Sequence, residues 1–125
     1  MVIDPQHTYV HLADDGKAHQ VSGESFWQLP PEAFDSFGKG WLVSEFLFTE
    51  DWPTWEMHPQ GEEFVYLLSG AVELLLDRGN EVETILLNGS GAVVVPRGVW
   101  HTAKVRVPSR MRHVTRGEGT GNRPV

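Results

Sequence analysis

Short apolar runs separated by turn-forming residues dominate this chain and restrict its fold more than any other feature. Seven such runs follow residue 40, at 41–48, 63–68, 71–76, 82–87, 92–95, 99–107 and 111–115. The breaks between them hold Gly, Pro, Asn and Asp, as in Asp77-Arg78-Gly79-Asn80, and these residues favour turns. Alternating helix and strand patterns are missing from the sequence, which argues against a parallel α/β sheet. The pattern predicts an all-β sandwich or barrel.

The two ends of the chain are less regular than its middle. Short strands are expected at 9–12 and 18–21, and Pro30-Pro31 favours the start of a short helical turn. A chain of 125 residues is long enough for one hydrophobic core, so we expect a single domain. Its expected parts are N-terminal strands and a helical segment in 1–40, a barrel core in 41–115 and a tail in 116–125 that crosses the surface or frays.

Composition and charge narrow the classes of partner. The chain has no cysteine, which removes disulfides, thiolate nucleophiles and cysteine-based metal sites. Its net charge of −7 repels nucleic acid and anionic membranes, so neither is an expected partner. No apolar run approaches the roughly 20 residues of a membrane helix, and the first residues lack the pattern of a secretory signal. We therefore expect a cytoplasmic protein that acts on a small molecule.

Two short runs carry the residues with the most chemistry. Glu56 and His58 are two positions apart, so on a strand they project from the same face. Glu63 opens the next strand, and His101 follows the turn at Pro96-Arg97-Gly98. Two imidazoles and at least one carboxylate on a β scaffold indicate a metal site.

These two runs resemble the paired sequence motifs of the cupin superfamily, whose members are double-stranded β-helix (jelly-roll) barrels. His58, Glu63 and Gly70 match the second His, the Glu and the last Gly of the motif G-x5-H-x-H-x3,4-E-x6-G, and Pro96, Gly98 and His101 match the motif G-x5-P-x-G-x2-H-x3-N. The resemblance covers about 41–115 and implies a jelly-roll cupin barrel with a metal-centred pocket. Because small cupins often pair through their N-terminal strands, it also implies a homodimer.

The sequence departs from the cupin motifs at two positions. Glu56 replaces the first histidine, and Val105 stands where the second motif ends in Asn. If all of Glu56, His58, Glu63 and His101 bind the metal, the oxygen-rich ligand set favours Fe or Mn, although Zn or Ni also binds such sites. If Glu56 does not bind it, the other three form a two-His-one-carboxylate triad, and Glu56 is a candidate catalytic base beside the metal.

Other residues are candidates for the pocket wall. Trp52 and Trp55 lie just before the first motif, and His113 alternates with Met111 and Thr115 along the last strand. A wall of this kind suits an aromatic or largely apolar substrate. His7, His11 and His19 have no partner pattern and are expected at the surface.

The resemblance and the ligand set together favour metal-dependent chemistry on a small organic molecule, with dioxygenase-type chemistry first. A metal-dependent isomerase or lyase is one alternative, and a non-catalytic cupin that binds a small ligand is another. These stay open because one fold hosts many reactions.

Overall fold

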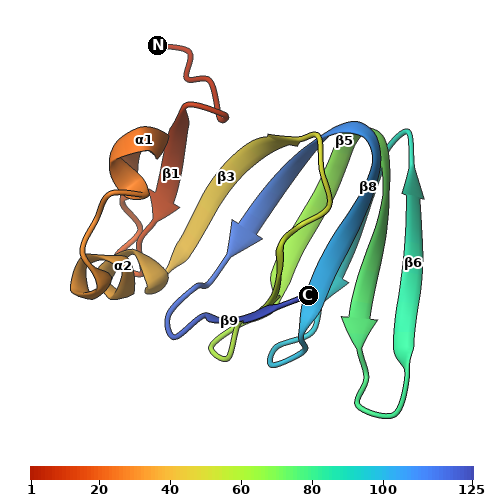
Figure 1. The fold of residues 1–125 in the computed structure, drawn as a ribbon. Coiled ribbons are helices and arrows are strands. Elements are labelled where there is room, and N and C mark those ends of the chain that lie inside the picture. Colours follow the sequence, from red (N-terminus) through yellow and green to blue (C-terminus); the bar gives the residue numbers. More distant parts are fainter.

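The computed structural model describes residues 1–34, 36–37 and 39–125 in full, and residues 35 and 38 only as parts of a helix. The protein is an antiparallel β structure with two short helices near its N-terminus (Figure 1). The helices are α1 (Gly23–Phe26) and α2 (Pro31–Gly38). The strands are β1 (Thr8–Leu12), β2 (Ala18–Ser22), β3 (Trp41–Phe48), β4 (Thr54–Met57), β5 (Glu63–Asp77), β6 (Val82–Asn88), β7 (Gly91–Val95), β8 (His101–Thr115) and β9 (Gly121–Pro124). This architecture confirms the predicted all-β fold.

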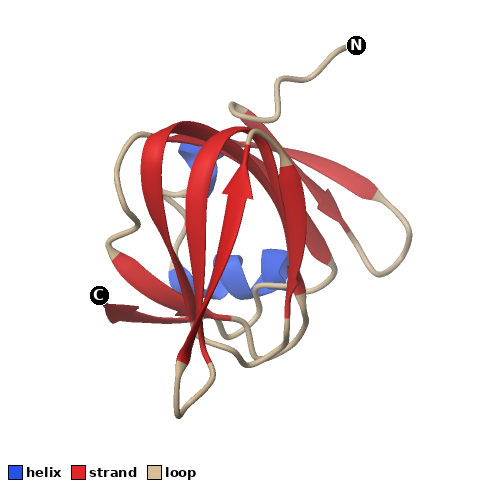
Figure 2. Ribbon diagram, turned by 90° about the vertical axis from the view of Figure 1, so that its right-hand side faces the viewer, coloured by secondary structure: helices blue, strands red, loops and turns tan.

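The strands curve around a common interior, as Figure 2 shows. Neighbouring strands follow the order β2-β1-β3-β8-β4-β9, while β5 pairs with β6, β7 and β8. The strand β8 therefore links the two parts of the sheet, because it pairs with β3, β4 and β5. One end of β8 carries His101, and the other end carries His113 and Thr115.

The two longest strands each replace a pair of shorter strands expected from the sequence. Both β5 and β8 run for 15 residues without a turn. Their pairing shifts register around Ser69 and Gly70, where the ladder contains a bulge that bends the sheet. Gly70 has φ +105°, and a Cβ there would lie 2.3 Å from Ser109 Oγ. The Ser109 hydroxyl in turn accepts a hydrogen bond from the Ala71 amide at 3.1 Å, so strand β8 passes against the bulge.

The core lies on the inward side of β5 and β8. Alternate residues of β5 are buried, including Val65, Leu67 and Leu74, each 0% exposed. Met111 of β8 packs with them. Glu63 and His101 lie on the same inward faces, so the fold that buries the apolar residues also buries two of the metal-ligating candidates.

In the tail, residues 121–124 form strand β9, which the sequence analysis did not predict. Strand β9 pairs antiparallel with β4, with Asn122 opposite Glu56. The Arg123 guanidinium lies over the rings of Trp55 and Trp100, 5.3 and 4.6 Å from their centroids, and donates to Asp77 at 2.6 Å. The tail is fixed because it covers the otherwise unpaired edge of β4 and because cation–π contacts hold it there.

Two further findings concern the N-terminal part and the helices. His11, expected at the surface, is only 7% exposed, because its Nε2 contacts the Lys39 carbonyl and its ring packs on Phe37. Within the described residues, neither helix is long and apolar enough to cross a membrane.

Candidate metal centre

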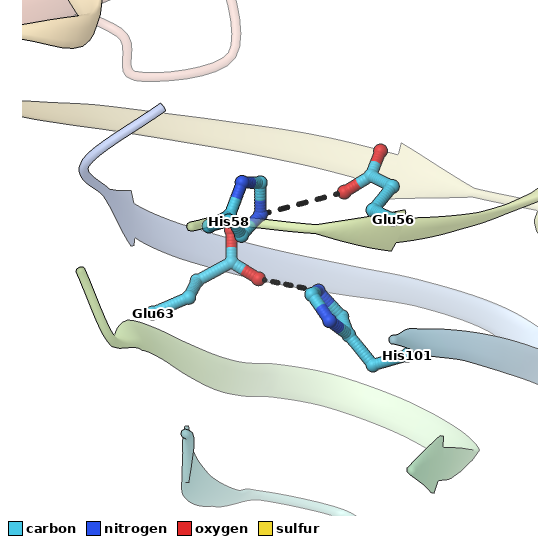
Figure 3. Close-up of side chains that lie close together, drawn as sticks. All are labelled: Glu56, His58, Glu63 and His101. Atoms are coloured by element: carbon cyan, nitrogen blue, oxygen red, sulfur yellow. Dashed lines mark hydrogen bonds and ion pairs between the residues drawn. The ribbon is translucent and has the colours of Figure 1, made fainter. Parts of the chain in front are cut away.

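Four side chains from three strands converge at one end of the barrel interior (Figure 3). Glu56 belongs to β4 and His58 follows it, while Glu63 begins β5 and His101 begins β8. Glu56 and His101 are direct partners in the β4–β8 pairing. One ligand atom from each of the four residues lies within 4.8 Å of the others. The structure thus brings together all four residues that the two motifs nominate.

His58 is held by a residue that the sequence analysis missed. Its Nδ1 lies 2.8 Å from Thr120 Oγ1, and that hydroxyl donates its own hydrogen to the Gly117 carbonyl at 2.7 Å. The hydroxyl must therefore accept from His58, which places the imidazole proton on Nδ1. The lone pair of His58 Nε2 is left facing the two carboxylates, at 3.3 Å from Glu63 Oε2 and 3.8 Å from Glu56 Oε2.

His101 is oriented in the same way by the backbone. Its side chain is 0% exposed, and Nδ1 donates to the Val99 carbonyl at 3.0 Å. Nε2 then faces Glu63 Oε1 at 3.0 Å. A neutral imidazole would turn a lone pair toward the carboxylate oxygen, so this contact requires either a proton on Nε2 or a cation between the two groups.

Glu63 lies at the centre of the cluster and is 3% exposed. Burial by itself raises the pKa of Glu63, but the hydrogen bond with His101 and the nearby imidazoles of His113 and His58 outweigh it and hold that pKa well below its usual value. For His101 burial lowers the pKa, and the adjacent Glu63 carboxylate outweighs this and raises it. Thr115 Oγ1 also donates to Glu63 Oε2, at 2.5 Å. Glu63 is therefore ionised, and positive charge beside it is favoured.

These residues fit a divalent cation. Among the described residues His58 Nε2 finds no hydrogen-bond partner, although it is buried between two carboxylate groups. A buried nitrogen lone pair of this kind is costly unless something satisfies it. In both histidines Nδ1 makes a hydrogen bond, which fixes the ring and leaves Nε2 available. Histidine metal ligands usually have this arrangement. The nitrogen and carboxylate donors suit Fe or Mn and also accept Zn or Ni.

Glu56 differs from the other three candidates in its exposure. Its side chain is 36% exposed, against 6% for His58 and 3% for Glu63. Glu56 lies at the edge of the cluster and also lines the cavity that opens beside it. The position is compatible with a fourth ligand and with a base that exchanges protons with a bound molecule.

A cavity of about 870 Å³ leads from the cluster to the helical segment. Glu56, His58 and Glu63 form its inner end, and aromatic side chains form much of the rest. The aromatic residues of this wall are Phe26, Trp27, Phe34, Phe37, Phe46, Phe48 and Trp52. The sequence analysis missed the contribution of α1, α2 and β3 to this wall, because only their packing across the barrel reveals it.

Two of the three predicted pocket residues lie in the wall. Trp52 and His113 line the cavity and are 7% and 6% exposed. The prediction for Trp55 was wrong. Thr54 and Glu56 line the cavity, and Trp55 between them projects from the other face of β4, where it packs under Arg123.

Comparisons with known proteins support the fold. No protein-family model matches the chain, and no curated protein matches it significantly. Among solved structures it is similar to a cupin-2 domain protein from Shewanella frigidimarina, with 16% identity, a TM-score of 0.51, and coverage of 59% of this chain and 68% of that chain.

Two enzymes are also among the similar structures. An oxalate oxidase matches with 18% identity and a TM-score of 0.51, over 65% of this chain and 44% of that chain. A hydroquinone 1,2-dioxygenase in complex with Cd²⁺ and 4-hydroxybenzonitrile matches with 15% identity and a TM-score of 0.51, over 60% of this chain and 56% of that chain. The match therefore spans about half of each enzyme chain. At these identities the similarity shows the fold, and it confirms the fold predicted from the two motifs.

Proposed function

We propose that this protein, whose fold is that of the cupins, is a metal-dependent enzyme that acts on a small organic molecule by dioxygenase-type chemistry. One observation carries the proposal. Four ligand atoms lie within 4.8 Å of one another at the inner end of an aromatic-lined cavity. A site that only stabilised the barrel would not need a cavity of about 870 Å³ opening onto it.

His58, Glu63 and His101 would hold the metal, with Glu56 as a fourth ligand or as a neighbour. The ion would polarise substrate oxygens and, as iron or manganese, supply the redox chemistry that a dioxygenase needs. The protein's own residues orient the substrate and manage its protons. The aromatic wall binds a flat apolar body and excludes water, while Glu56, partly exposed at the cavity, accepts a proton from an acidic substrate group.

Support for oxygen-dependent chemistry comes from the ligand set and from the fold. A two-His site with one or two carboxylates matches the donor preference of Fe and Mn. The similar structures include proteins named as an oxalate oxidase and a hydroquinone 1,2-dioxygenase, so this fold accommodates such reactions. The fold supports oxygen-dependent chemistry by analogy, and the geometry of the site is the main support for the proposal.

A metal-dependent isomerase or lyase is the second candidate, and the exposure of Glu56 favours it. A carboxylate that is 36% exposed beside a metal site is placed to move a proton between two positions of one substrate. Such an enzyme needs no redox change at the metal. The metal identity therefore separates the two candidates.

The first test is elemental analysis of protein purified without a metal-affinity resin, for the native chain and for His101→Ala. About one Fe or Mn per chain, lost in His101→Ala, supports the proposal and leads to oxygen-electrode assays with hydroxylated aromatic compounds. One Zn or Ni per chain, with no oxygen uptake after loading with Fe²⁺, favours the isomerase or lyase. If no metal is present and none is taken up on titration, the enzyme proposal fails and a ligand-binding cupin remains.

A further inference from the structure

Two buried side chains of the cavity wall have polar atoms with no partner. Trp52 Nε1 and His113 Nε2 are both without a hydrogen bond to any part of the chain that the structure describes. Their residues are 7% and 6% exposed, and both line the cavity next to the metal centre. Neither atom takes part in the metal chemistry proposed above.

The surroundings explain why the protein itself does not satisfy these atoms. The His113 ring packs edge-on against the rings of Phe46 and Phe48, with centroids 5.7 and 6.1 Å away, and the Trp52 ring is 5.7 Å away. Trp52 also packs against Phe48, at 5.3 Å. Packing alone would not require a polar ring nitrogen at either position. A buried polar group left unpaired costs on the order of 1–3 kcal/mol, so its retention calls for a partner that arrives from outside.

The two atoms have complementary hydrogen-bonding roles. The indole Nε1–H of Trp52 can only donate. His113 Nδ1 lies 3.8 Å from Glu63 Oε2, and the ionised carboxylate favours the proton on that nitrogen. Nε2 of His113 is then an acceptor. One donor and one acceptor on adjacent rings match a hydroxyl group, which accepts one hydrogen bond and donates another.

We propose that Trp52 and His113 recognise a hydroxyl group on an aromatic substrate. The substrate oxygen accepts from Trp52 Nε1–H, and the substrate hydrogen is donated to His113 Nε2. Neither nitrogen is open to solvent in the ligand-free cavity, so this recognition requires both rings to rotate toward the hydroxyl as the ligand enters. The inference rests on the proposed function, since it takes this cavity as the substrate site, and it adds the class of substrate: a hydroxylated aromatic molecule rather than an ether or a hydrocarbon.

The test compares two probes of similar shape, 2-naphthol and 2-methoxynaphthalene, by calorimetric titration of the full chain. Each titration is done on the protein as purified and again after dialysis against a chelator. In both states the native protein should bind 2-naphthol on the order of tenfold more tightly, as expected for one hydrogen bond made and one buried acceptor satisfied. The variants are His113→Phe and Trp52→Phe, with His113→Gln to restore an acceptor. His7→Phe is the control, since the same substitution there falls on an exposed histidine outside this cavity.

The ratio of the two affinities is the quantity to follow, because a merely structural loss weakens both probes alike. This ratio should fall to within about twofold of unity in His113→Phe, recover in part in His113→Gln and stay unchanged in His7→Phe. Because the oxygen of the methoxy probe also accepts a hydrogen bond, Trp52→Phe should weaken the binding of both probes rather than abolish the ratio. The inference is overturned if the ratio is near one in the native protein, if it survives in His113→Phe, if Trp52→Phe binds both probes as tightly as the native protein, or if the ratio appears only with metal present. The chelated state also separates this test from the enzyme proposal: a missing metal would end that proposal and leave the hydroxyl preference measurable.

Discussion

The hydroxyl of Thr120 should control how tightly the protein binds its metal. Thr120 accepts from His58 Nδ1 at 2.8 Å and is itself fixed by donating to Gly117. In Thr120→Val a methyl group takes the place of the oxygen, so the N–H of a histidine that is 6% exposed loses its partner. An unpaired buried N–H costs roughly 1–3 kcal/mol, and replacing a residue that orients a metal ligand typically lowers metal affinity 10–100-fold. Because Thr120 itself is at the surface, we expect the lower end, on the order of tenfold.

The assay is a competition titration of Zn²⁺ or Mn²⁺ between the protein and a chelator dye of known affinity. Thr120→Ser keeps the hydroxyl and should bind within about twofold of the native protein. Thr54→Val is the matched control, because the Thr54 hydroxyl contacts only Asn122, at 3.4 Å among the described residues. An affinity in Thr120→Val equal to that of Thr54→Val would refute the idea that this hydrogen bond orients His58.

Three further outcomes follow from the same structure. Glu63→Gln should abolish stoichiometric metal binding, whereas Glu56→Gln should lower the metal affinity by about tenfold or less. Equal losses of affinity in the competition titration would contradict the peripheral position of Glu56. In thermal melts of chelated protein, the ion pair of Glu63 and His101 should stabilise most between about pH 4.5 and 6.5, the ordinary pKa values of the two groups. Stability is lost as the pH rises through the raised pKa of His101 or falls through the lowered pKa of Glu63. Metal affinity should instead rise as His101 loses its proton, so a parallel trend would speak against His101 as a ligand. Finally, in urea unfolding Gly70→Ala should lower the free energy of unfolding by at least about 2 kcal/mol more than Gly79→Ala does. Both glycines have positive φ, but only at Gly70 would an added Cβ meet a neighbour, Ser109 Oγ. Similar losses in the two variants would show that the bulge can relax.

The sequence predicts most strands because turn-forming residues separate short runs of apolar residues. Strand β3 begins and ends at the predicted residues, Trp41 and Phe48. The two long strands were each predicted as two, because Ser69-Gly70 and Pro108-Ser109 have the composition of turns. In the structure these segments face each other across one bulge, and only the pairing of β5 with β8 shows that they continue the strands.

The sequence predicted those site residues whose relative positions are fixed by their spacing along one strand or one turn. The motif spacing nominates the four residues of the cluster, and the structure gathers them. The contact of Thr115 with Glu63 could have been suspected, because Thr115 alternates with His113 along one strand. The structure places Thr115 opposite Glu63 in the sheet. The sequence holds no such indication for Thr120, because its role depends on how the tail returns to β4. The homodimer and the cytoplasmic location stay predictions.

The link between His58 and Thr120 also bears on the order of events during biosynthesis. The two residues are 62 positions apart, and the tail that carries Thr120 docks through pairing with β4 and the contacts of Arg123. All four candidate ligands are synthesised by residue 101, before the group that fixes His58 exists. A growing chain therefore offers ions a loose and unselective set of donors, since preformed sites are rare in unfolded chains. If the cluster holds the proposed metal, its discrimination among ions begins only when residues 117–124 have folded back onto β4.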